Sequence, residues 1–106
     1  MSISAQLEIF TEVMNERTRQ NEKFGPQDHN LYKWIAILLE EVGEASQAIL
    51  KTEFEGGNIE AVEAELIQVA AVSVYMLERI DHHKDCGTLS KIIQTGNQYG
   101  IQEPTA

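Results

Sequence analysis

Cysteine, proline and basic side chains are scarce in this sequence of 106 residues. Its single cysteine, Cys86, excludes an internal disulfide and any zinc site that needs several thiolates. Eight Lys and Arg residues stand against 17 Asp and Glu residues, and the net charge of -9 argues against nucleic acid and anionic membranes as partners. With so little cysteine, a reducing cytoplasm is the expected location.

Long apolar runs and strand-like alternation are also missing. No apolar run reaches the roughly 18 residues that a transmembrane helix needs. Residues 1–10 lack the basic segment and the apolar core of a secretory signal peptide. At 42% hydrophobic and 24% charged residues, the composition predicts one globular, all-α domain over residues 1–106.

Three segments carry helical periodicity in their apolar residues, and glycine-containing breaks separate them. Gly25-Pro26 ends the first segment, and Gly56-Gly57 ends the second. Asp28 or Asn30 can cap the second helix, and Asn58 can cap the third. One face of the first segment is formed by Leu7, Phe10, Met14 and Arg17. The predicted helices cover residues 4–22, 30–53 and 59–81.

The third predicted helix is apolar on nearly every side between residues 66 and 77. Such a helix is buried all round, and one small domain can hardly cover it, so we expect a subunit interface there. Residues 81–85 are expected to form a polar turn with His82 and His83 at its surface. Thr88 is expected to cap a short fourth helix that runs to residue 95, and residues 97–106 form a loosely ordered tail. The predicted fold is a dimerising four-helix-type bundle around a central antiparallel hairpin.

Two clusters of oxygen-bearing side chains lie on the second and third predicted helices. Glu41 and Glu44 are three residues apart and project together, as do Glu65 and Gln68. Glu44 and Glu65 lie equally far from a point just before Gly56-Gly57, and so do Glu41 and Gln68. An antiparallel hairpin around that break therefore brings the four side chains together about 15 Å from the turn.

The chemistry of these acids indicates a metal site. Glutamates on a helix often form no more than a solvated face, but Glu41 and Glu65 border apolar surface. Carboxylates at close range repel one another unless a cation lies between them. Oxygen ligands suit Mg²⁺, Mn²⁺ or Ca²⁺, and Mg²⁺ commonly bridges to substrate phosphates. The pattern points to phosphoryl chemistry, with a solvated acidic face as the alternative.

At these residues the sequence resembles the MazG-like family of all-α nucleoside triphosphate pyrophosphohydrolases. The motif is Glu40-Glu41-x-x-Glu44, followed about twenty residues later by Glu65-x-x-Gln68. Residues 16–25 (ERTRQNEKFG) and 65–72 (ELIQVAAV) also resemble segments of short phage and bacterial members. The resemblance covers roughly residues 10–82.

The resemblance implies a helical dimer or a dimer of dimers. It also implies Mg²⁺-dependent cleavage, with Mn²⁺ as a substitute, of (d)NTPs between the α- and β-phosphates, which removes unwanted nucleotides. By position, Glu41, Glu44 and Glu65 would ligate the metal ion. Glu40 would orient or deprotonate the attacking water. Gln68 stands where the family has an acid; its carbonyl oxygen can still bind a cation but adds no charge.

Basic and aromatic side chains are the candidates for binding the triphosphate substrate. The candidates for holding phosphate are Lys51, Lys33 and Arg79. Phe24 and Trp34 can stack on a nucleobase, although Trp34 continues the apolar stripe of its helix and so favours core packing. The resemblance adds Gln20 and Lys23 as residues of the base pocket.

Two other functions stay open at this point. Gln68 in place of an acid is compatible with a catalytically weak helical module that binds a nucleotide or a partner. A ferritin-like redox bundle uses inward Glu-x-x-His motifs, which this sequence lacks. Magnesium-dependent pyrophosphohydrolysis is therefore the leading expectation.

Overall fold

The computed structural model describes residues 1–93, which form three α-helices and one short 3₁₀ turn. Helix α1 spans Ile3–Phe24, α2 spans Leu31–Phe54, α3 spans Ile59–Cys86, and the 3₁₀ turn η1 spans Leu89–Lys91. The predicted all-α class is confirmed. Within residues 1–93 no helix is both long enough and apolar enough to cross a membrane.

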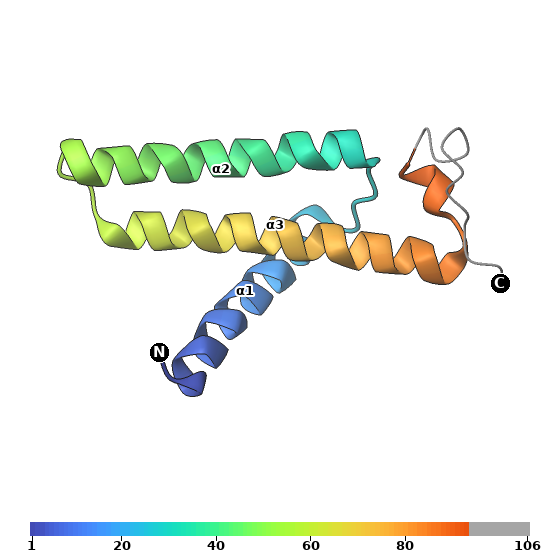
Figure 1. The fold of residues 1–106 in the computed structure, drawn as a ribbon, viewed down its shortest axis with the longest axis horizontal. Coiled ribbons are helices and arrows are strands. Elements are labelled where there is room, and N and C mark those ends of the chain that lie inside the picture. Colours follow the sequence, from blue (N-terminus) through green and yellow to red (C-terminus); the bar gives the residue numbers. More distant parts are fainter. Residues whose placement is uncertain (94–106) are drawn as a thin grey trace.

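Helices α2 and α3 form the predicted antiparallel hairpin and run side by side (Figure 1). Gly56 in the connection adopts a φ of 73°, a conformation that residues with a side chain rarely take. The Asn58 side chain then caps α3 by accepting a hydrogen bond from the backbone N–H of Ala61. Asn30 caps α2 in the same way, through the N–H of Lys33. These local signals set the helix ends close to where the sequence predicts them.

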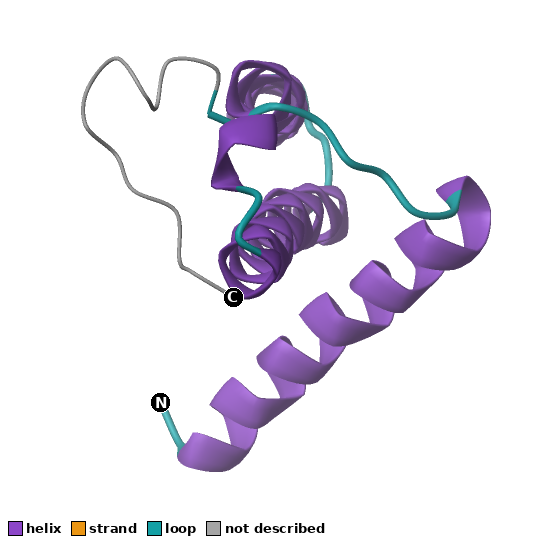
Figure 2. Cartoon of the chain, turned by 90° about the vertical axis from the view of Figure 1, so that its right-hand side faces the viewer, coloured by secondary structure: helices purple, strands orange, loops and turns teal. Residues whose placement is uncertain are grey.

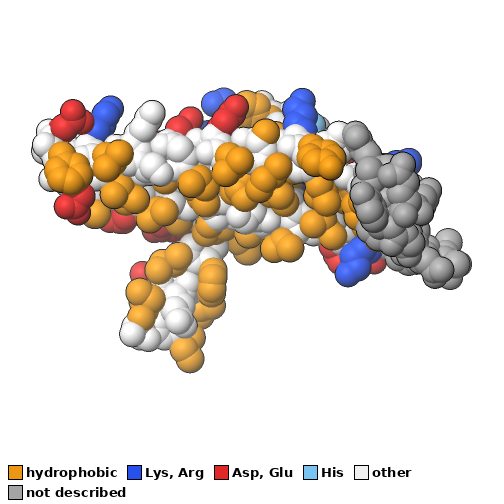
Figure 3. Space-filling model, turned by 45° about the horizontal axis from the view of Figure 1, so that its top comes forward, with side chains coloured by type: hydrophobic (Ala, Val, Ile, Leu, Met, Phe, Trp, Pro, Cys, Tyr) orange, Lys and Arg blue, Asp and Glu red, His pale blue; other side chains and the backbone are white. Residues whose placement is uncertain are grey.

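The C-terminal half of α1 packs against α3, and the N-terminal half of α1 projects away from the hairpin (Figures 1 and 2). Arg17 is the buried member of the face that the sequence predicts for this helix, and the apolar members of that face remain exposed. Leu7, Phe10 and Met14 are 58%, 63% and 68% exposed, whereas Val13 and Arg17 are buried. Hydrophobic side chains are accordingly visible on the surface of this projecting half (Figure 3).

Arg17 is the centre of the contact between α1 and α3. Its guanidinium donates two hydrogen bonds to the carboxylate of Glu78, at 2.7 and 3.0 Å. The guanidinium carbon also lies 3.7 Å from the centre of the Tyr75 ring, a cation–π contact. Gln20 and Asn21 accept further hydrogen bonds from Arg17 at 3.2 Å. A buried charge with this many partners fixes the position of α1 more specifically than an apolar contact would.

The prediction of a polar turn at residues 81–85 is wrong, because α3 continues to Cys86. It ends only at Gly87, which takes the left-handed conformation with a φ of 66°. The prediction that His83 lies on the surface is also wrong, since the residue is 2% exposed. One ring nitrogen of His83 bonds the hydroxyl of Thr88 at 2.7 Å, and the other bonds Asp28 at 3.0 Å. These partners let the polar side chain be buried where the chain turns.

The start of the predicted fourth helix forms only the turn η1, which follows Thr88. The rest of that predicted helix and the predicted tail lie outside the described residues. Ile92, just after η1, is buried, and its carbonyl accepts a hydrogen bond from the N–H of Leu31 at 3.0 Å. The turn therefore closes the end of the hairpin where α2 begins.

The buried core is small and lies along the seams between the helices. Trp34 is its largest fully buried side chain, and its ring centre lies 5.0 Å from those of His29 and Tyr75. The sequence argument for core packing of Trp34 is thereby confirmed. The buried hydrophobic residues are Val13, Trp34, Ala45, Val62, Ala71, Val72, Tyr75 and Ile92.

Candidate functional site

Three glutamates from the two hairpin helices meet at one point. Carboxylate oxygens of Glu41, Glu44 and Glu65 all lie within 4.8 Å of one another. Glu41 and Glu44 come from adjacent turns of α2, and Glu65 comes from the facing side of α3. The hairpin thus brings Glu44 and Glu65 together, as their equal distance from the break predicts. We call these three residues the acidic cluster.

The electrostatics of the acidic cluster are unfavourable without a cation. Burial raises the pKa of Glu41 above its ordinary value, and the charges of Glu44 and Glu65 raise it further. Burial likewise raises the pKa of Glu65, with Glu44 adding to the effect through its charge and a hydrogen bond. One oxygen of Glu65, Oε2, is shielded from solvent and has no hydrogen-bond partner among residues 1–93. A bound cation would relieve both conditions.

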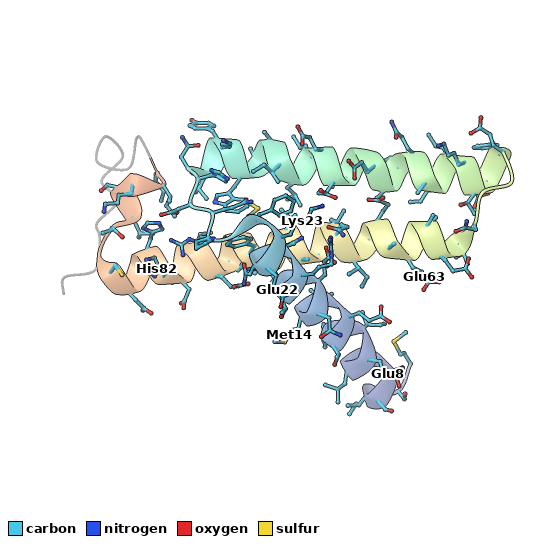
Figure 4. The ribbon with its side chains drawn as sticks, turned by 180° about the vertical axis from the view of Figure 1, so that it is seen from behind. Glu8, Met14, Glu22, Lys23, Glu63 and His82 are labelled. Atoms are coloured by element: carbon cyan, nitrogen blue, oxygen red, sulfur yellow. The ribbon has the colours of Figure 1, made fainter. Side chains whose placement is uncertain are left out.

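The acidic cluster lines one side of a pocket of about 380 Å³. The C-terminal half of α1 also lines the pocket and contributes two cationic side chains, Arg19 and Lys23. Figure 4 shows Lys23 where the end of α1 meets the hairpin, whereas Glu8 lies at the far end of α1. The pocket is therefore lined by carboxylates from the hairpin and by cationic side chains from α1. Such an arrangement suits a ligand that binds a metal ion at one side and carries negative charge at the other.

Gln68 joins the pocket to α1 through two hydrogen bonds. Its amide nitrogen donates to a carboxylate oxygen of Glu16 at 2.6 Å, and its carbonyl accepts a bond from Gln20 at 3.4 Å. Glu16 is held in turn by Arg19, and the hydrogen bond from Arg19 is the main cause that lowers the pKa of Glu16. Gln68 lines the pocket, and its amide is hydrogen-bonded to partners on α1.

The aromatic residues of the pocket differ in how much surface they offer to a ligand. Phe24 is 57% exposed at the end of α1, and Trp34 is 2% exposed beneath it in the core. Tyr75 is also buried, and its hydroxyl bonds the backbone of Gln27. Phe24 is consequently the more exposed aromatic side chain of the pocket, and the ammonium of Lys23 lies over its ring, 5.1 Å from the ring centre.

The other predicted site residues lie outside this pocket. Lys51 lines an adjoining hollow of about 340 Å³ that shares Glu44 and Glu65 with the first. Arg79 forms an ion pair with Asp28 at 3.2 Å and lines a different hollow beside Arg17. Lys33 and Glu40 lie on the exposed side of α2, although the charge of Glu40 contributes to the raised pKa of Glu41. Gln20, Lys23, Phe24 and Trp34, the other candidates for substrate binding, line the pocket, and their role stays a prediction.

Sequence reasoning missed Glu16 and Arg19 on the α1 side of the pocket. Together with Gln20 and Lys23 they follow the spacing of one helix face, which is the signal that identifies them. The helix face that contains Leu7 is more hydrophobic and dominates the periodic pattern of this helix. The polar face that contains Glu16 and Arg19 is therefore harder to recognise in the sequence. Tyr75 was missed because it lies within a nearly continuous apolar run.

The donor set fits a hard divalent cation. Three carboxylates at this spacing supply only oxygen ligands, and Oε2 of Glu65 is buried with no hydrogen-bond partner in the described part of the chain. Mg²⁺, Mn²⁺ and Ca²⁺ prefer such ligands, and the open pocket leaves room for water and for a ligand. Comparison of the chain with family models, curated proteins and solved structures finds no significant match in any of the three.

Proposed function

We propose that this chain is a magnesium-dependent hydrolase that cleaves (d)NTPs between the α- and β-phosphates and so clears unwanted nucleotides from the cytoplasm. The observation that carries the proposal is that the acidic cluster lines one pocket together with Arg19 and Lys23. A triphosphate bound to a metal ion carries negative charge on the phosphates and positive charge on the metal. An acidic protein can bind such a ligand because the metal ion neutralises the phosphates. The resemblance to MazG-like enzymes supports the same reaction.

Each wall of the pocket has a distinct task in this proposal. Glu41, Glu44 and Glu65 hold Mg²⁺, which supplies charge neutralisation at the phosphates. Arg19 and Lys23 approach the phosphate chain from α1. Glu40, which is exposed beside the acidic cluster, accepts a proton from the attacking water. The hydroxyl group and the proton of that water end on the two products when the α–β anhydride bond is cleaved. The products are a nucleoside monophosphate and pyrophosphate.

Recognition of the base is assigned to the junction of α1 and the hairpin. Phe24 has the exposed ring face on which a nucleobase can stack, and base–aromatic stacking is tolerant of base identity. Gln20 lies next to it on the pocket wall and carries amide groups that can hydrogen-bond a base edge. Trp34 supports this wall from the core rather than contacting the base face to face.

The test is hydrolysis of a panel of canonical and modified NTPs and dNTPs with Mg²⁺ or Mn²⁺. We expect metal-dependent release of monophosphate and pyrophosphate in equal amounts. Glu44→Gln should lower kcat/KM at least a hundredfold, because it removes one charge of the cation site. The matched control is Glu53→Gln, an exposed position near the end of the same helix, which should retain activity.

A second candidate function is a nucleotide-binding or partner-binding module without turnover. The observation that favours it is the neutral Gln68, whose amide is already hydrogen-bonded to α1. Nucleotide-dependent thermal stabilisation without any product in the panel would support this function. Turnover that Glu44→Gln abolishes would rule it out.

We further propose that two copies of the chain pair through the exposed apolar residues of α3 and α1. Leu66, Val74 and Leu77 of α3 are 50%, 36% and 65% exposed, and folded monomers rarely leave so many large apolar side chains in water. The same holds for Phe10 and Met14 on α1. A dimer, or a dimer of dimers, would complete the four-helix-type packing around α3.

The dimer is checked by sedimentation equilibrium. We expect a mass of twice the 11.9 kDa chain, or a multiple of that dimer. Leu77→Glu should shift the protein toward the monomer, because a charge at the centre of an apolar interface loses its hydration. Ser46→Glu, at an exposed position of α2, serves as the control and should leave the mass unchanged. A wild-type chain that sediments as a monomer would contradict the proposal.

A further inference from the structure

Four side chains form a directed line of hydrogen bonds between α1 and α3. Arg17 donates to the carbonyl oxygen of Gln20 at 3.2 Å. The amide of Gln20 donates to the carbonyl of Gln68 at 3.4 Å, and the amide of Gln68 donates to Glu16 at 2.6 Å. The line begins at a buried cation and ends at a carboxylate whose side chain is 11% exposed.

The charged ends determine the orientation of both amides in this line. A guanidinium can only donate hydrogen bonds, and an ionised carboxylate can only accept them. Gln20 must therefore present its oxygen to Arg17, and Gln68 must present its nitrogen to Glu16. Neither amide can rotate by half a turn without placing two donors or two acceptors against each other.

The line also brings a further negative charge to the acidic cluster. Gln68 lies one helical turn after Glu65 and lines the same pocket, but it is neutral. Glu16 lies directly behind the Gln68 amide, and its charge is among those that raise the pKa of Glu41. The acid nearest to position 68 thus comes from α1, one hydrogen bond further out, and it is paired there with Arg19.

We propose that Glu16, itself held in place by Arg19, is a positioning residue of the cation site, which holds the Gln68 amide from α1. The inference rests on the proposed function insofar as it requires a divalent cation at the acidic cluster. Residues that hydrogen-bond the groups around a metal ion typically change its affinity by ten- to a hundredfold when they are replaced. It follows that cation binding depends on the packing of α1 against α3.

The experiment measures Mn²⁺ alone binding to the full chain, by the electron paramagnetic resonance signal of free Mn²⁺. Glu16→Gln should weaken binding about tenfold. The double variant Glu16→Gln/Gln68→Glu exchanges the acid and the amide, so it keeps the net charge and an acid–amide hydrogen bond. It should return the affinity to within about threefold of the wild type. Glu12→Gln, one turn earlier on α1 and outside the pocket, is the control of equal charge.

Thermal unfolding without cation separates this role from a merely structural one. We expect Glu16→Gln to keep the wild-type melting temperature without cation. A melting temperature that falls together with the Mn²⁺ affinity would show that Glu16 only packs α1, and the inference would be overturned. Equal affinity of the Glu16→Gln and Glu12→Gln variants would overturn it as well. Wild-type protein that binds Mn²⁺ without hydrolysing any nucleotide would contradict the proposed function alone. Wild-type protein that binds no Mn²⁺ would contradict both.

Discussion

Replacing Glu65 with glutamine is expected to lower metal-dependent hydrolysis at least a hundredfold and, at neutral pH, to make the cation-free protein more stable. Activity falls because the cation site loses the carboxylate that α3 contributes. Stability rises because the buried, ionised Glu65 lies against Glu44 and has an oxygen without a partner among residues 1–93. A neutral amide of the same shape removes that repulsion.

The pH dependence of thermal stability provides a separate test of whether Glu65→Gln stabilises the cation-free protein. The pKa of Glu65 is raised above its ordinary value of 4.5, so the folded state holds the proton more tightly than the unfolded state does. The resulting stabilisation is present below the ordinary pKa and is lost as the pH rises through the raised value. Thermal melts of wild type and Glu65→Gln should therefore agree in acid and diverge toward neutral pH.

Two comparisons decide the Glu65 prediction. Glu63→Gln changes an exposed glutamate of the same helix and should match the wild type in both activity and melting temperature (Figure 4). Added Mg²⁺ should raise the melting temperature of wild type but not of Glu65→Gln, because a ligand stabilises only the state that binds it. A Glu65→Gln variant that keeps full activity, or that melts earlier than wild type at pH 7 without cation, would contradict the assignment of the site.

Replacing Arg17 with methionine is expected to lower the free energy of unfolding by about 2–3 kcal/mol and to release α1 from α3. Arg17 is 6% exposed in the wild type. The methionine variant loses the bidentate ion pair with Glu78 and the cation–π contact with the Tyr75 ring. Glu78 is half-exposed in the wild type, so water can take the place of Arg17 and the loss stays below that of a fully buried pair. Urea denaturation measures the change.

The Arg17 variant also tests how the pocket is built. Arg19, Gln20, Lys23 and Phe24 all reach the pocket from α1, so nucleotide binding should weaken when that helix is released. Arg17→Lys keeps the charge but not the paired hydrogen bonds, and its effect should be intermediate. An Arg17→Met protein within about 0.5 kcal/mol of wild type would show that other contacts hold α1.

The hairpin and its acidic cluster could be predicted because every signal for them is local to one turn. Gly56 and Asn58 mark the break, and equal distances from that break place Glu44 opposite Glu65. In an antiparallel hairpin the pairing of residues follows from the position of the turn. The sequence could accordingly predict which acids meet without any knowledge of the rest of the chain.

The packing of α1 could not be predicted in this way. The apolar members of its strongest periodic face, among them Leu7 and Phe10, remain exposed in the chain, and the contact is centred on Arg17, the polar member of that face. That contact depends on Glu78, which is 61 residues away, and no spacing rule links the two. The direction of the Gln68 amide could not be predicted either, because it depends on the position of Glu16 on the neighbouring helix α1.

The end of α3 illustrates the same division. The sequence indicates a polar segment around His83, and polarity without its partners favours a surface turn. The tertiary structure buries His83 because Asp28 and Thr88, from two other segments, satisfy both ring nitrogens. By itself, the sequence determined the helices, their caps and the pairing of acids across one turn, since these depend on neighbours along the chain. Only the tertiary structure decided which polar groups are buried and which charges face the pocket, because the free energy of a buried polar group depends on partners distant in the chain.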